Sequence, residues 1–214
     1  MKHTLPRRSD GFTLLEILVV AAIMGVVMTL GTSTFVGVTR AWNERRAITD
    51  LDDQARAALE SIRQDMESTL SSEVSGAVLS GASRTVTDDR SYPPATYTDD
   101  DLVLAIESTD AARGAATPMK VAYKVERNGA TGNLMRTTGG LGAEFPQGAP
   151  LQVIPAKVQG FSVEYLGRGP GAVWNETWAG PGLPGAVRVS IALEHPVRSE
   201  YQVARKAVFP IHVH

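Results

Sequence analysis

The sequence predicts an α+β protein, in which one long N-terminal helix is followed by an antiparallel β-sheet domain. Three observations support this prediction. Residues 12–38 are almost wholly apolar or small, and their one charge is Glu16. Between residues 48 and 74, apolar side chains recur every three or four positions, which is the helical period. From residue 102 onward the period becomes two, which is typical of strands with one buried face.

The apolar segment is long enough to cross a membrane. Its 27 residues, from Phe12 to Val38, would form a helix about 40 Å long, against a hydrocarbon core of about 30 Å. A helix also forms all of its backbone hydrogen bonds internally, as a segment in lipid must. Because Lys2, Arg7 and Arg8 precede the segment and such basic flanks stay cytoplasmic, we expect a single-pass span at 12–38 with a cytoplasmic N-terminus.

The position of the candidate cleavage site is unusual. An ordinary secretory signal has about 7–15 apolar residues and then a small-residue cleavage site. Here the apolar run is about twice as long, and no such site follows it. The candidate cut instead precedes the run, between Gly11 and Phe12, since glycine lets a protease approach the backbone closely. Residues 1–11 are therefore expected to be a leader peptide.

Glu16 is the anomalous residue of the apolar segment. A carboxylate inside a membrane span costs about 2.5–3.5 kcal/mol at the centre of the helix and indicates a functional residue. Thr13-x-x-Glu16 also fits a capping box, in which the glutamate bonds a backbone donor, and helix N-termini favour acidic residues. The residues alone leave both interpretations open.

The segment from the basic leader through Gly11 and the sequence FTLLE at residues 12–16 resembles the class III signal of type IV pilins and type II secretion pseudopilins. This resemblance implies a pilin-like fold, cleavage between Gly11 and Phe12 by a prepilin peptidase, and N-methylation of Phe12. It also implies that Glu16 pairs with the amino terminus of a neighbouring subunit during assembly. We favour that role because it accounts for a carboxylate in an apolar span better than a cap does.

The helix is expected to continue past the membrane as an amphipathic segment over residues 39–79. Its periodic apolar face ends near Val74, and Gly76 and Gly81 are the candidate stops. Such a face is expected to pack on a sheet.

Residues 80–101 are rich in Ser, Thr, Asp and Pro and are expected to form a loop. Asp99, Asp100 and Asp101 are oxygen ligands of the kind that calcium takes, but they lack the spacing of a calcium loop. We therefore expect a solvated acidic turn.

Residues 80–214 are predicted to form a periplasmic β domain. Adjacent strands with short links favour antiparallel pairing, and Asn128-Gly129 is expected to form a turn. The expected strands are Leu102–Glu107, Met119–Arg127, Leu134–Thr137, Leu151–Ile154, Val158–Leu166, Val187–Glu194 and Tyr201–His214.

Trp174 and Trp178 lie four apart in a Gly- and Pro-rich loop over residues 167–185. Tryptophan is enriched at interfaces, so both are candidate interface residues. The alternative, which we favour, is that both rings fold back over the sheet and cover the edge of its core.

The composition excludes several function classes. The net charge of −2 gives nucleic-acid binding no electrostatic support. No cysteine is present, which excludes disulfides and thiolate metal sites. His212 and His214 could share a strand face, but no third metal ligand is evident. Since nucleophile, zinc and phosphate motifs are also missing, we predict no enzyme activity, no metal and no cofactor.

The C-terminal half, from Phe161 through both tryptophans to Leu193, looks like that of J-type minor pseudopilins, and so does Leu59–Met66. These motifs are looser than the signal, and W-type minor pilins of type IV pili are built similarly. The resemblance implies an inner-membrane subunit of the pseudopilus tip in type II secretion, which helps to start assembly and to export folded proteins across the outer membrane. Its implied partners are the I-, K- and H-type minor pseudopilins, the major pseudopilin and the prepilin peptidase. The alternatives are a W-type minor pilin and a membrane-tethered binding module that uses the helix only as an anchor.

Overall fold

The computed structural model describes residues 13–69, 79–88, 95–110, 115–128, 131–142, 146, 148–179, 182–195 and 202–211. The chain divides into two compact units, Met1–Arg46 and Ala47–His214. The one helix among the described residues, α1 (Leu14–Glu67), contributes to both units.

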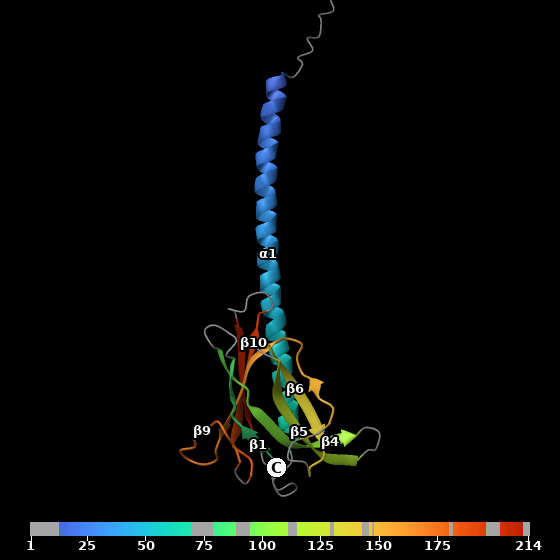
Figure 1. Cartoon of the computed structure of the whole chain (residues 1–214), viewed down its shortest axis with the longest axis vertical. Coiled ribbons are helices and arrows are strands. Elements are labelled where there is room, and N and C mark those ends of the chain that lie inside the picture. The colour runs from blue at the N-terminus through green and yellow to red at the C-terminus, as the bar shows by residue number, and fades with distance from the viewer. Residues whose placement is uncertain are drawn as a thin grey trace, which may run out of the picture. The chain divides into compact units, whose positions relative to one another are not determined.

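The first unit consists, where it is described, of α1 from Leu14 to Arg46 (Figure 1). Its side chains are exposed almost throughout. The exposed residues include large apolar ones along the whole predicted span, from Leu14 to Val38. By length and composition, α1 is long and apolar enough to cross a membrane.

The second unit is built on an antiparallel sheet. Its main sheet has nine strands in the order β1-β4-β5-β6-β8-β10-β11, with β7 paired to β6 and β9 paired to β8, and β2 and β3 form a separate hairpin. The strands are β1 (Leu79–Ala82), β2 (Thr85–Asp88), β3 (Ala95–Thr98), β4 (Asp101–Asp110), β5 (Ala115–Asn128), β6 (Thr131–Gly139), β7 (Leu151–Gln152), β8 (Val158–Leu166), β9 (Trp174–Asn175), β10 (Ala186–Glu194) and β11 (Gln202–Pro210).

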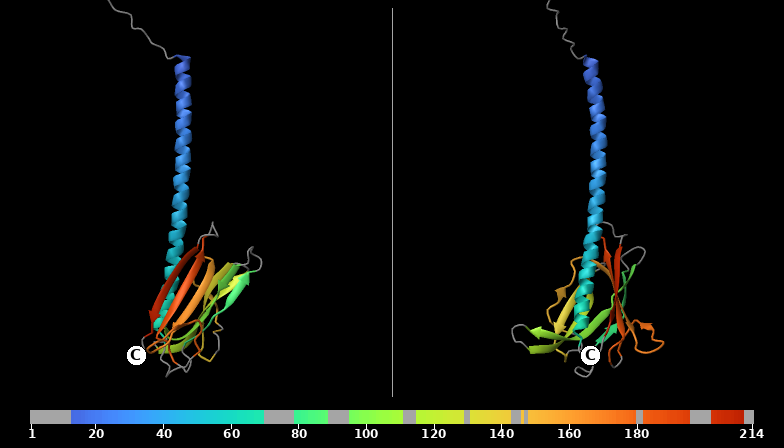
Figure 2. Two further views of the ribbon diagram at one scale, coloured as in Figure 1. Left: turned by 90° about the vertical axis from the view of Figure 1, so that its left-hand side faces the viewer. Right: turned by 180° about the vertical axis from the view of Figure 1, so that it is seen from behind.

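The C-terminal part of α1 packs on this sheet (Figure 2). Ala55, Ala58 and Ile62 of the helix are fully buried in one core with Leu102 of β4 and Val189 of β10. The two alanines allow a close approach of helix and sheet, and burial of a side chain such as Ile62 contributes about 1.5–3 kcal/mol. The predicted α+β class, with a long N-terminal helix on an antiparallel sheet, is confirmed.

The helix ends earlier than predicted. The sequence placed the end of its periodic apolar face near Val74 and the end of the amphipathic segment at residue 79. The helix stops at Glu67, and the Ser68 hydroxyl and amide both donate to the Gln64 carbonyl, at 3.0 and 3.1 Å. Thr69 then forms a β-bridge with Ile106 of β4. The chain therefore leaves the helix to join the sheet edge. The apolar positions at 70 and 74 lie outside the described residues.

The predicted loop over residues 80–101 is also wrong, since it contains most of β1 and all of β2 and β3. Gly81 exchanges two backbone hydrogen bonds of 3.1 Å with Trp178. A Cβ at position 81 would lie 1.6 Å from the Tyr165 hydroxyl oxygen, so a glycine is required there. β1 depends on partners further along the chain, β4 and Trp178, whereas β2 and β3 pair with each other.

Candidate assembly site

The N-terminal end of α1 places Glu16 in the first helical turn. The Glu16 amide donates to the Thr13 hydroxyl at 3.3 Å and to the Thr13 carbonyl at 3.0 Å. Thr13 thus caps the helix with its hydroxyl, which is one of the two hydrogen bonds of a capping box. The Glu16 side chain is exposed. Its carboxylate makes no hydrogen bond or ion pair with any residue that the structure describes, so the cap leaves both carboxylate oxygens available to another group.

The two residues of the predicted cleavage site, Gly11 and Phe12, lie outside the described residues. The same holds for His212 and His214. Among the described ranges, no group of three or more His, Asp or Glu side chains is placed to hold a metal ion.

Hydroxyl side chains between Thr29 and Thr39 make hydrogen bonds within α1. Their hydroxyls donate to carbonyls three or four residues earlier, at 2.8–2.9 Å, in Thr29, Thr32, Ser33, Thr34 and Thr39. In lipid, an unsatisfied hydroxyl would be costly. These bonds therefore make the segment compatible with a hydrocarbon environment despite its threonines.

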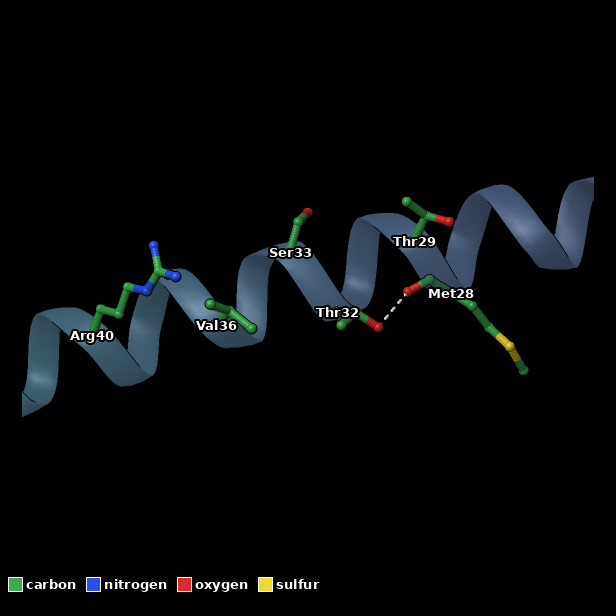
Figure 3. A pocket seen from close by; sticks show the side chains of 7 residues that line it. Met28, Thr29, Thr32, Ser33, Val36 and Arg40 are labelled. Carbon is green, nitrogen blue, oxygen red and sulfur yellow. Dashed lines mark hydrogen bonds between the residues drawn. The ribbon is translucent and has the colours of Figure 1, made fainter.

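Small residues open a shallow hollow along one face of this helix (Figure 3). It is lined by Met28, Thr29, Thr32, Ser33, Val36, Gly37 and Arg40. A Cβ added at Gly25, Gly31 or Gly37 would meet nothing within 4 Å. The glycines thus have no packing partner within the described chain. At about 100° per residue they lie on three different sides of the helix, and of the three only Gly37 lines the hollow.

The two candidate interface tryptophans are placed differently. Trp178 packs against the core, its ring lies 6.4 Å from that of Tyr165, and its indole N–H donates to the Gly182 carbonyl at 3.1 Å. Its ring folds back on the core, as expected. Trp174 instead pairs with Leu166 through β9 and β8, and its ring lies over Arg188, with the guanidinium carbon 4.1 Å from the ring centroid. The Trp174 ring thus folds back over the sheet, but it does not pack on the core, so the expected cover of the core edge is wrong for Trp174.

Arg188 connects Trp174 to two further charges on the sheet. Its guanidinium donates to both oxygens of Glu164, at 2.6 and 2.7 Å, and Lys206 lies 3.8 Å from the same carboxylate. The hydrogen bonds from Arg188 lower the pKa of Glu164. The sequence did not reveal this cluster, because it depends on the register that sets Arg188 opposite Glu164.

The three consecutive aspartates do not form the solvated turn that we expected. Asp99 and Asp100 are 0% and 1% exposed. Asp99 accepts two hydrogen bonds from Arg127, and the Arg127 guanidinium also donates to the Gln159 carbonyl at 2.7 Å. Asp100 accepts the Val163 amide at 2.7 Å, and burial raises its pKa. These carboxylates bind neighbouring strands to one another.

Asp99 lies close to the junction between β6 and β8, which explains why it connects strands. Between β6 and β8 the sheet is joined by a single pair, Gly132 and Val158. Asp99 forms a parallel bridge with Phe161 of β8 and holds Arg127 of β5. The Asp99–Arg127 pair thus links the two halves of the sheet where their direct pairing is weakest.

A comparison with known families matches the N-terminal segment. The prokaryotic N-terminal methylation motif matches residues 6–32. This region contains Gly11, Phe12, Glu16 and most of the apolar segment. The prediction of a class III signal is confirmed at the level of this motif. It supports a type IV pilin-like protein whose N-terminal helix is suited to membrane anchoring.

Two solved structures are similar at low identity. A type IV-like pilin, TTHA1219 from Thermus thermophilus, matches 74% of this chain and 93% of its own, with 12% identity and a TM-score of 0.43. A chain in the structure of the GspK-GspI-GspJ complex of the type 2 secretion system from enterotoxigenic Escherichia coli matches 52% of this chain and 68% of its own length, with 14% identity and a TM-score of 0.33. No curated protein sequence matches the chain.

Proposed function

We propose that this chain is a structural subunit of a pilin-like filament, specifically a J-type minor pseudopilin at the pseudopilus tip of a type II secretion system. The observation that carries the proposal is the methylation motif over residues 6–32. Within this motif, Glu16 lies in the first turn of α1, and the cap leaves its carboxylate available to another group. A W-type minor pilin would share both features. The choice of the J type is based on the looser resemblance of residues 161–193.

The proposed mechanism is mechanical rather than catalytic. Prepilin peptidase cuts between Gly11 and Phe12 and the new amino terminus is N-methylated. The helix then holds the subunit in the inner membrane, with the sheet domain in the periplasm. There it meets the I-, K- and H-type minor pseudopilins and the major pseudopilin, and the tip complex starts growth of the filament that exports folded proteins.

Glu16 has a definite role in this mechanism. An isolated carboxylate in the hydrocarbon region is unfavourable, by about 2.5–3.5 kcal/mol at the centre of a span and by less near its end, where Glu16 lies. The amino terminus of a neighbouring subunit would neutralise it, and the attraction between the two charges is strong in a low-dielectric medium. Assembly therefore relieves a cost that the lone subunit bears, which favours transfer of the helix from lipid into the filament.

Replacement of Glu16 by Ala or Gln should leave membrane insertion intact and reduce incorporation into the filament several-fold. Both variants remove the charge, while Gln keeps the size and polarity of the side chain. The matched control is Asp53→Asn, which changes one exposed carboxylate on the same helix. Cross-linking to neighbouring subunits and secretion of an exported protein measure the effect. Normal secretion in Glu16→Ala would contradict charge pairing and favour the membrane-tethered binding module.

A further inference from the structure

Directly after the predicted span, α1 carries a short basic segment that the proposed function does not use. The segment Arg40–Arg46, which we call the collar, reads RAWNERR and holds three arginines, Glu44 and Trp42. From Leu14 to Thr39 the only charge is Glu16. The collar is thus the first charged part of the helix beyond the apolar segment, and its net charge is positive.

Three side chains of the collar, those of Arg40, Trp42 and Arg46, are exposed. Trp42 is 74% exposed. Neither Arg40 nor Arg46 makes a hydrogen bond or ion pair with a residue that the structure describes. At about 100° per residue, Arg40 lies on a different side of the helix from Trp42 and Arg46. The collar therefore surrounds the helix and does not form one stripe.

The distance from the start of the helix favours a lipid headgroup as the ligand. Arg40 is 26 positions after Leu14, which corresponds to about 39 Å along the axis. A bilayer is about 30 Å thick in its hydrocarbon core and about 40–45 Å with its headgroups. If the helix enters the core near Leu14, Arg40 and Trp42 reach the opposite headgroup layer. Tryptophan rings prefer that layer, and arginine side chains extend into it from a helix.

We propose that the collar binds the phosphate groups of anionic phospholipids in the leaflet at the C-terminal end of the span. The guanidinium groups of Arg40 and Arg46 pair with the phosphates, while Trp42 fixes the depth of the helix. This proposal rests on the membrane span of the proposed function and extends it. The subunit must release these lipids when its helix is transferred into a filament, so the collar opposes premature extraction.

The test uses energy transfer from Trp42 in the full-length chain, reconstituted in vesicles of phosphatidylcholine and phosphatidylglycerol. One preparation carries fluorescently labelled phosphatidylglycerol, and the other carries equally labelled phosphatidylcholine. Subtracting the signal of Trp42→Phe removes the contribution of Trp174 and Trp178. We expect about fivefold enrichment of phosphatidylglycerol around Trp42 at low salt, the ratio that corresponds to about 1 kcal/mol, and a loss of most of it at high salt.

The double variant R40Q/R46Q should bring this ratio close to one. The matched control R56Q/R63Q removes the same charge from exposed arginines further along α1 and should keep the enrichment. A ratio near one in the parent chain, or an unchanged ratio in R40Q/R46Q, would overturn the proposal. The proposal would also be overturned if a second copy of the chain shields Trp42 and no lipid is enriched around it. That result would assign the collar to a protein contact.

Alkaline extraction of the same vesicles separates this proposal from the proposed function. If the chain resists extraction but shows no lipid preference, only the proposal about the collar is contradicted. If the chain is extracted and shows no energy transfer to either lipid, the membrane span on which the proposed function depends is contradicted as well.

Discussion

Replacing Asp99 by alanine is expected to lower the free energy of unfolding by about 3–5 kcal/mol, because it removes the carboxylate that neutralises a buried guanidinium. Asp99 is fully buried, and the Arg127 side chain is 9% exposed. The loss falls at the point where β6 and β8 share a single pair, so the two halves of the sheet should separate more readily. Denaturant unfolding of the full chain in detergent, followed by tryptophan fluorescence, measures the change.

Two further variants define the cause of this effect. Asp53→Ala removes an exposed carboxylate from α1 and should change the stability by less than about 0.5 kcal/mol. The double variant Asp99→Leu/Arg127→Met replaces the ion pair by apolar groups and should recover much of the loss, since buried pairs tolerate such replacement. A cost for Asp99→Ala no larger than for Asp53→Ala would show that the pair does not hold the sheet together.

Replacing Asp65 by alanine is expected to cost about 3 kcal/mol and to loosen the end of α1 from the sheet. Asp65 accepts two hydrogen bonds of 2.9 Å from Arg136 of β6 and one of 2.6 Å from the Tyr123 hydroxyl of β5. Burial and the neighbouring Asp65 raise the pKa of Tyr123 well above its usual range, so this hydroxyl stays protonated and donates. The alanine variant leaves Arg136 and Tyr123 without this acceptor.

The smaller change Tyr123→Phe should cost only about 1 kcal/mol, since the ion pair between Asp65 and Arg136 stays in place. Hydrogen exchange in the last turns of α1 provides the local measurement. Exchange there should accelerate strongly in Asp65→Ala and little in Tyr123→Phe. Equal protection in Asp65→Ala and the parent chain would contradict the anchoring role of Asp65.

Elements with strong local periodicity were predicted well from the sequence. The expected bounds of β8 agree with the structure, and β4, β5, β6 and β10 were expected within their observed ranges or one residue from them. The short strands β1, β2, β3 and β9 were missed. They hold two to four residues each, which is too short for a repeating pattern.

A site residue could be predicted from the sequence where its own position in the chain made it unusual. Glu16 stood out as the one charge in an apolar segment, whereas Asp99 and Arg188 acquire their roles only through strand register.

Mass spectrometry of the mature N-terminus tests the proposed pilin-like function most directly. The chain is expressed in a host that makes a prepilin peptidase, and a Gly11→Val variant serves as the unprocessed control. We expect a mature chain that lacks residues 1–11 and begins with N-methylated Phe12. An intact amino terminus, or a cut at any other bond, would contradict a pilin-like assembly subunit.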